Sequence, residues 1–87
     1  MNKMEEEFEH NCSLVKLLPK RPSDDELLML YALYKQATLG DNKTIEPGFF
    51  NIKARIKWNS WKSVEGMEKE QAMRHYILKV KELISNI

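Results

Sequence analysis

Apolar side chains recur every three or four residues in four separate stretches of this chain, and no other feature constrains its fold as strongly. The last stretch is the most regular, and its stripe consists of Met73, Tyr76, Ile77, Val80, Leu83, Ile84 and Ile87. With three glycines and three prolines, the 87 residues hold few of the turn formers that a strand-rich fold needs. We therefore expect one all-α domain over residues 1–87, folded as a four-helix bundle.

Prolines and a capping motif mark the limits of the first two expected helices. The first runs from about Met4 to Leu18, where the segment PKRP stops it because proline has no backbone N–H to donate. The second begins at PSDDELL, in which Ser23 and Glu26 form a capping box. It continues to Gly40, a typical C-terminal stop. Because apolar residues surround much of this helix, we expect it at the centre of the bundle.

About ten residues without a helical pattern, GDNKTIEPGFF, follow the second helix. Adjacent antiparallel helices usually need a shorter connection than this. A long crossover lets the third helix, from about Asn51 to Val64, run parallel to the second. Gly66 closes the third helix, and the fourth starts near Glu68. The sequence thus predicts one long connection, between the second and third helices.

Composition and charge argue against several classes of protein. The net charge is +1, so no global field directs the chain to nucleic acid or to a membrane. Cys12 is the single cysteine, which excludes an internal disulfide, and the two histidines have no metal-ligand spacing. No phosphate-binding glycine loop or nucleophile elbow is present, and the start MNKMEEEFEH lacks the apolar run of a secretory signal. We expect a cytoplasmic binding protein without metal, cofactor or catalytic activity.

The segment YALYKQATLGD, residues 31–41, contains the first candidate site. In a helix, Tyr31, Tyr34 and Lys35 stand at positions i, i+3 and i+4 and project together. A tyrosine buries an apolar ring while its hydroxyl needs a partner or water, so two rings beside an ammonium indicate a half-buried surface with a polar task. Tyrosines at the boundary of a small core are also common, and the segment alone does not decide between these interpretations.

The segment KARIKWNSWK, residues 53–62, carries four basic residues and no acidic one. Lys53 and Lys57 lie one helical turn apart, as do Trp58 and Trp61. The pattern fits a phosphate-binding row beside aromatic rings, or an amphipathic helix with its tryptophans inward; the stretch by itself favours the second. Two further functions stay open: a single-stranded nucleic-acid binder and a helical module that binds a peptide partner.

Three blocks of the chain together resemble the acyl-CoA-binding protein family. YALYKQATLGD, PGFFNIKARIKWNSW and AMRHYILKVKEL follow the family's Tyr-x-x-Tyr-Lys-Gln-Ala-Thr-x-Gly-Asp, Lys-x-x-x-Lys-Trp-x-x-Trp and Ala-Met-x-x-Tyr-Ile patterns in order. The resemblance implies an up-down-down-up bundle that binds medium- to long-chain fatty acyl-CoA thioesters and transports or buffers them without chemistry. It also implies a monomer that makes transient contacts with acyl-CoA-using enzymes or membranes and binds no nucleic acid.

The resemblance assigns residues to the two parts of the ligand. Contacts with the adenine and the ribose 3′-phosphate carry over to Lys16, Tyr31, Tyr34, Lys35, Lys57 and Tyr76. The acyl groove carries over to Phe8, Cys12, Leu27, Leu28, Lys53 and Ile56. Cys12 and Ile56 stand where the family usually has small residues, which leaves the preferred acyl length open. Glu68 replaces the usual Ser or Thr before the fourth helix, and we expect it to lose a cap that contributes ~1 kcal/mol.

Overall fold

The computed structural model describes residues 2–86, which form helices α1 (Lys3–Val15), α2 (Asp24–Leu39), α3 (Ile52–Lys62) and α4 (Lys69–Ser85). No strand occurs between residues 2 and 86, and the predicted all-α class is confirmed. None of the helices in this range is long and apolar enough to cross a membrane. Ile87, the last member of the predicted apolar stripe, lies outside the described residues.

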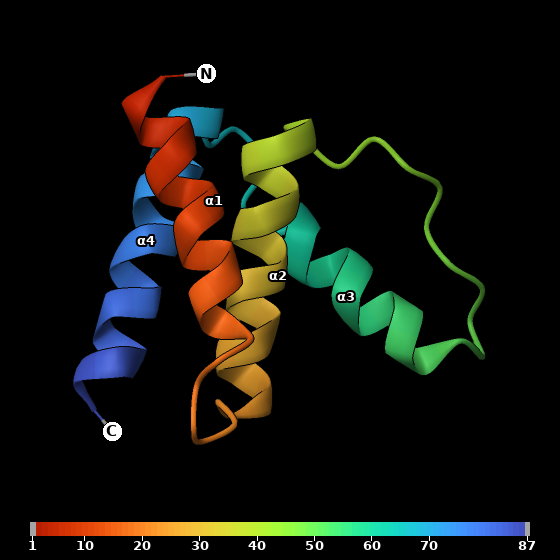
Figure 1. Ribbon diagram of the computed structural model, residues 1–87. Coiled ribbons are helices and arrows are strands. Elements are labelled where there is room, and N and C mark those ends of the chain that lie inside the picture. The colour runs from red at the N-terminus through yellow and green to blue at the C-terminus, as the bar shows by residue number, and fades with distance from the viewer. Residues whose placement is uncertain (1, 87) are drawn as a thin grey trace.

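The helices are arranged up-down-down-up, with α1 and α4 running in one direction and α2 and α3 in the other (Figure 1). α2 packs against both α3 and α4, and α1 packs against α4. The central position predicted for α2 is therefore confirmed. The connection from α2 to α3 swings out from the bundle before α3 begins, as expected for a long crossover (Figure 1).

Three of the four helices build the core. Its buried members are Phe8 of α1, Leu30, Leu33 and Ala37 of α2, and Ala72, Tyr76, Ile77 and Val80 of α4. Among the buried residues of α3, by contrast, the structure shows only Trp61. α3 is thus attached to the face of α2 rather than built into the core, which leaves a groove between these two parallel helices.

The helix ends follow the predicted capping pattern, but α1 and α3 are shorter than predicted, and α3 ends at Lys62 rather than near Val64. In the capping box of α2, the Glu26 amide donates to Ser23 Oγ at 3.2 Å and the Ser23 amide donates to Glu26 Oε1 at 2.9 Å. Glu68, before α4, makes no side-chain cap hydrogen bond, as expected. α1 ends at Val15, earlier than predicted, because its last residues tighten into i→i+3 turns such as Leu17 N to Leu14 O at 2.9 Å.

Candidate functional site

A hollow of about 520 Å³ lies between α2 and α3, a volume typical of sites that hold small ligands. We name it the α2–α3 hollow. Its apolar lining consists of Leu27, Leu28 and Ile56, and its polar lining consists of Arg21, Asp24, Tyr31, Lys53 and Lys57. Residues that the sequence assigned to the nucleotide, Tyr31 and Lys57, therefore share one hollow with residues assigned to the acyl chain.

Two ammonium groups flank the ring of Tyr31 at the rim of this hollow. Lys35 Nζ lies 5.9 Å from the ring centroid and Lys57 Nζ lies 5.7 Å from it. Lys35 Nζ also lies 5.5 Å from the ring of Trp61. Aromatic faces attract cations, so the Tyr31 ring holds an ammonium group from each of the two helices. An anion bound beside this ring would be attracted by both charges.

A second group of aromatic rings, the aromatic seam, consists of Phe8, Tyr34 and Tyr76. Phe8 stacks on Tyr34 with centroids 5.9 Å apart and meets Tyr76 edge-on at 5.1 Å. Tyr34 thus turns toward α1 and α4, whereas Tyr31 turns toward α3. The two tyrosines therefore have different neighbours, because α2 packs against α4 as well as against α3.

Cys12 is half-buried and packs against the core cluster that contains Phe8 and Tyr76. Burial raises the pKa of the Cys12 thiol and of the Tyr76 hydroxyl, and the nearby Lys16, which is exposed at the end of α1, counteracts this only in part for Cys12. A thiol with a raised pKa is a poor nucleophile near neutral pH. Neither Phe8 nor Cys12 lines the α2–α3 hollow, so the structure separates them from the other residues assigned to the acyl groove.

The second half of YALYKQATLGD holds the fold together. Gln36 Nε2 donates to Asp41 Oδ1 and to the Met67 carbonyl, both at 2.8 Å. The Gly66 amide donates to the same Asp41 oxygen at 2.8 Å. These bonds attach the end of α2 to the turn between α3 and α4. They also lower the pKa of the Asp41 carboxyl, with the Gly66 hydrogen bond as the main cause.

The tryptophans of α3 are structural, as the sequence favoured. Trp61 is buried and donates from Nε1 to the Gly40 carbonyl at 2.9 Å, while Trp58 donates to Thr44 Oγ1 at 3.0 Å. Both bonds attach α3 to the connection that precedes it. α3 thereby presents Lys53 and Lys57 along the edge of the α2–α3 hollow.

Sequence reasoning missed two residues of the hollow, Arg21 and Asp24. Asp24 precedes Leu27 and Leu28 by three and four residues, so helical spacing alone could have placed it on the same face. Arg21 carried no such signal, since it lies in the irregular connection before α2 and forms an ion pair with Asp24 at 3.0 Å.

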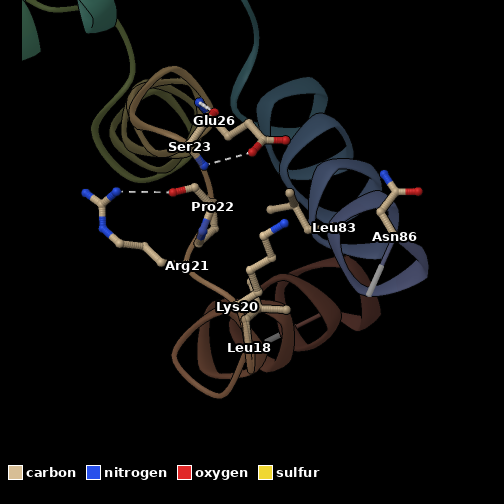
Figure 2. A pocket seen from close by; sticks show the side chains of 8 residues that line it. All are labelled: Leu18, Lys20, Arg21, Pro22, Ser23, Glu26, Leu83 and Asn86. Atoms are coloured by element: carbon tan, nitrogen blue, oxygen red, sulfur yellow. Dashed lines mark hydrogen bonds between the residues drawn. The ribbon is translucent and has the colours of Figure 1, made fainter.

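Another hollow, of about 360 Å³, lies between the connection of α1 to α2 and the end of α4 (Figure 2). Lys20 points into it near Leu83, whereas Arg21 turns away and donates to the Pro22 carbonyl at 3.3 Å (Figure 2). None of the residues assigned to the ligand lines this hollow. Between residues 2 and 86 no cluster of His, Cys, Asp and Glu could hold a metal ion.

The sequence model of the family described as "Acyl CoA binding protein" matches residues 5–80. This chain belongs to the acyl-CoA-binding protein family. The acyl-CoA-binding protein of Gossypium hirsutum is 54% identical over 80 residues, which span 92% of this chain and 90% of that protein. The acyl-CoA-binding protein of Saccharomyces cerevisiae is 51% identical over 78 residues, which span 90% of each.

Solved structures of acyl-CoA-binding proteins share the fold of this chain. The crystal structure of Oryza sativa Acyl-CoA-Binding Protein 2 has a TM-score of 0.92 and 51% identity, and the match covers 95% of this chain and 92% of that one. The solution structure of the yeast protein has a TM-score of 0.71 and 51% identity, with 91% and 92% covered. The four-helix bundle predicted from the sequence is thus confirmed by close structural relatives.

Proposed function

We propose that this protein binds fatty acyl-CoA thioesters and carries or buffers them as a cytoplasmic monomer, without catalysing a reaction on them. One observation carries the proposal: the α2–α3 hollow combines an apolar lining with Tyr31, whose ring is flanked by Lys35 and Lys57. Acyl-CoA has the same division, since a hydrocarbon tail is joined to a polyanionic nucleotide. Relatives of about half-identical sequence bear the name acyl-CoA-binding protein, which supports the same ligand.

The nucleotide binds at the rim of the hollow in this proposal. The Tyr31 ring stacks on adenine, and the ammonium groups of Lys35 and Lys57 pair with phosphate oxygens as point charges. Such charge-assisted hydrogen bonds are about twice as strong as neutral ones. Tyr34 and Lys16 extend the contact on the α1 side, because both side chains are exposed there. Tyr76 is buried, and we assign its hydroxyl to the innermost part of this contact.

The acyl chain lies in the hollow against Leu27, Leu28 and Ile56, and the aliphatic stem of Lys53 covers its edge. Each methylene buried there contributes up to about 0.8 kcal/mol, so affinity rises with chain length over medium and long tails. Phe8 has 4% of its surface exposed, and we therefore propose that Phe8 and Cys12 support the tyrosines from behind rather than contact the tail.

The proposed task is sequestration of the tail from water. The thioester needs no chemistry from the protein, and the raised pKa keeps the thiol of Cys12 protonated near neutral pH, so that it does not exchange acyl groups. Free CoA lacks the apolar half of the ligand and a free fatty acid lacks the nucleotide. Each should therefore bind less tightly than the conjugate.

Isothermal titration calorimetry tests this proposal with hexadecanoyl-CoA, free CoA and hexadecanoate on the same protein. The expected result is one-to-one binding of the conjugate and much weaker binding of either half. The proposal is overturned if hexadecanoyl-, tetradecanoyl- and octanoyl-CoA all fail to bind, or if free CoA binds as tightly as the conjugate. Steeply salt-dependent binding of a single-stranded oligonucleotide in place of acyl-CoA would instead favour the nucleic-acid function.

A further inference from the structure

The α2–α3 hollow carries positive side chains at both of its ends. At the rim, the ammonium group of Lys57 lies 5.7 Å from the centroid of the Tyr31 ring. Asp24 precedes Tyr31 by two helical turns on α2, and Lys53 precedes Lys57 by one turn on α3. Because α2 and α3 run parallel, Asp24 and Lys53 lie together at the opposite end, which we name the far end (Figure 1). The helical rise places Asp24 about 10 Å from Tyr31 along α2.

The middle of the hollow is apolar. Leu27 and Leu28 lie between Asp24 and Tyr31 on α2, and Ile56 lies between Lys53 and Lys57 on α3; all three side chains line the hollow. A hydrocarbon chain that leaves the rim therefore crosses an apolar strip before its terminal carbon meets the charged groups of the far end.

One cation of the far end has no anionic partner among the described residues. Arg21 Nη2 donates to Asp24 Oδ1 at 3.0 Å, so these two charges offset each other. Lys53 is exposed, and the ion pairs formed within residues 2–86 do not include it. Side chains on a helix lean toward the helix start, which directs the ammonium group of Lys53 away from the rim. The far end thus has a net positive charge and an ammonium group available to an anion.

A tail that ends in a methyl group and a tail that ends in a carboxylate differ at this place. The methyl group gains nothing from an ammonium group, whereas the carboxylate accepts a charge-assisted hydrogen bond from it. We propose that the hollow also accepts acyl-CoA thioesters of dicarboxylic acids, with the terminal carboxylate of the tail paired to Lys53. This ligand class rests on the proposed function, because it uses the same hollow and the same nucleotide contacts.

Calorimetry with two ligands tests the pairing: dodecanoyl-CoA, and dodecanedioyl-CoA, which has a carboxylate in place of the terminal methyl group. The wild-type protein should bind the two with dissociation constants within about tenfold of each other, since an unpaired carboxylate in an apolar site would cost far more. Lys53→Met keeps the aliphatic stem and removes the ammonium group. It should weaken dodecanedioyl-CoA relative to dodecanoyl-CoA by about fivefold, as for an exposed ion pair.

A second variant changes the charge of the far end in the opposite direction. Asp24→Asn removes the anion and releases Arg21, so dodecanedioyl-CoA should bind more tightly relative to dodecanoyl-CoA than it does in the wild-type protein. The matched control Lys43→Met removes an exposed ammonium group from the connection between α2 and α3, outside the hollow. It should leave the ratio of the two dissociation constants as in the wild-type protein.

Three results would overturn the proposed pairing. They are failure of dodecanedioyl-CoA to bind a protein that binds dodecanoyl-CoA, a ratio that stays unchanged in Lys53→Met, and an equal change of the ratio in Lys43→Met. The second would mean that the carboxylate stays in bulk water, and the third would assign the effect to net charge. Failure of both ligands to bind would overturn the proposed function and the pairing with it, so the two cases are distinguishable.

Discussion

Tyr31 is the residue at which the apolar and the charged parts of the site meet. Its ring lines the α2–α3 hollow and lies within 6 Å of two ammonium groups. A phenylalanine would keep the packing and lose the hydroxyl, whereas an alanine would also release Lys35 and Lys57 from the ring face. Lys35 and Lys57, rather than the core residues, therefore determine that the rim of the hollow favours an anionic ligand group.

Replacing Lys35 by methionine should weaken binding of hexadecanoyl-CoA roughly ten- to hundredfold, because a hydrogen bond to a charged group contributes about 1.5–3 kcal/mol. The aliphatic stem is retained, so the midpoint of urea unfolding should hardly change. Calorimetry measures the affinity.

The matched control is Lys20→Met, which removes an ammonium from the hollow between the α1–α2 connection and the end of α4. This variant should bind hexadecanoyl-CoA as the wild-type protein does. Equal loss of affinity in the two variants would mean that net charge, rather than the position of Lys35 beside Tyr31, governs binding.

At the scale of single elements, the helix starts differ in how well they are capped. Ser23 caps α2 through its hydroxyl, while Glu68 before α4 has an extended backbone and no side-chain cap bond. Glu68→Ser should therefore raise the free energy of unfolding by about 0.5–1 kcal/mol, and Ser23→Ala should lower it by ~1 kcal/mol. Urea titrations of both variants at one pH provide the measurement; a drop in stability for Glu68→Ser would contradict the capping argument.

Asp41 connects two elements through a carboxylate whose pKa is lowered by its hydrogen bonds to Gly66 and Gln36. Since the unfolded state then binds more protons in acid, the contribution of Asp41 to stability is complete above the ordinary carboxyl pKa of about 4. It is lost as the pH falls through the lowered folded pKa.

Asp41→Asn keeps an acceptor oxygen but cannot titrate, so its free energy of unfolding should fall less steeply in acid than that of the wild-type protein. Urea titrations from neutral pH down to about pH 2 give both slopes. Glu26 also has a lowered pKa and titrates in both proteins, so a residual slope should remain in the variant. Identical slopes would show that the Asp41 hydrogen bonds are not formed in solution.

At the scale of the whole molecule, α3 is the least integrated helix. Among the four described helices it packs against α2 alone, and Trp61 is its one buried residue. Regions with few buried contacts open locally at a lower free energy than the core. Backbone amides of α3 should therefore exchange hydrogen faster than those of α2 and α4, as measured by NMR or mass spectrometry.

Ligand binding should reduce this difference in hydrogen exchange between α3 and the other helices. A ligand that lies between α2 and α3 at a hundredfold excess over its Kd stabilises the closed state by about 2.7 kcal/mol, so α3 amides should slow most on addition of hexadecanoyl-CoA. Slowing confined to α1 and α4 would place the ligand outside the α2–α3 hollow.

Local sequence determined the elements of this protein. The apolar period, the capping box at Ser23 and the stop at Gly40 predict the helices, because these signals act between residues a few positions apart. The same kind of signal indicates the central place of α2 and the long crossover after it. The resemblance of the sequence to the acyl-CoA-binding protein family also singles out Tyr31, Lys35 and Lys57, which the local patterns by themselves left undecided.

Only the tertiary structure decided on which side of α2 each residue of the candidate site lies. It turned Tyr34 toward Phe8 rather than toward Tyr31, and it brought Arg21 into the α2–α3 hollow. It also gave Gln36 a structural partner 31 residues away in the chain, the Met67 carbonyl. Such contacts depend on which helices pack on each side of α2. Helix packing is set by the fit of whole surfaces, which no short window of sequence contains.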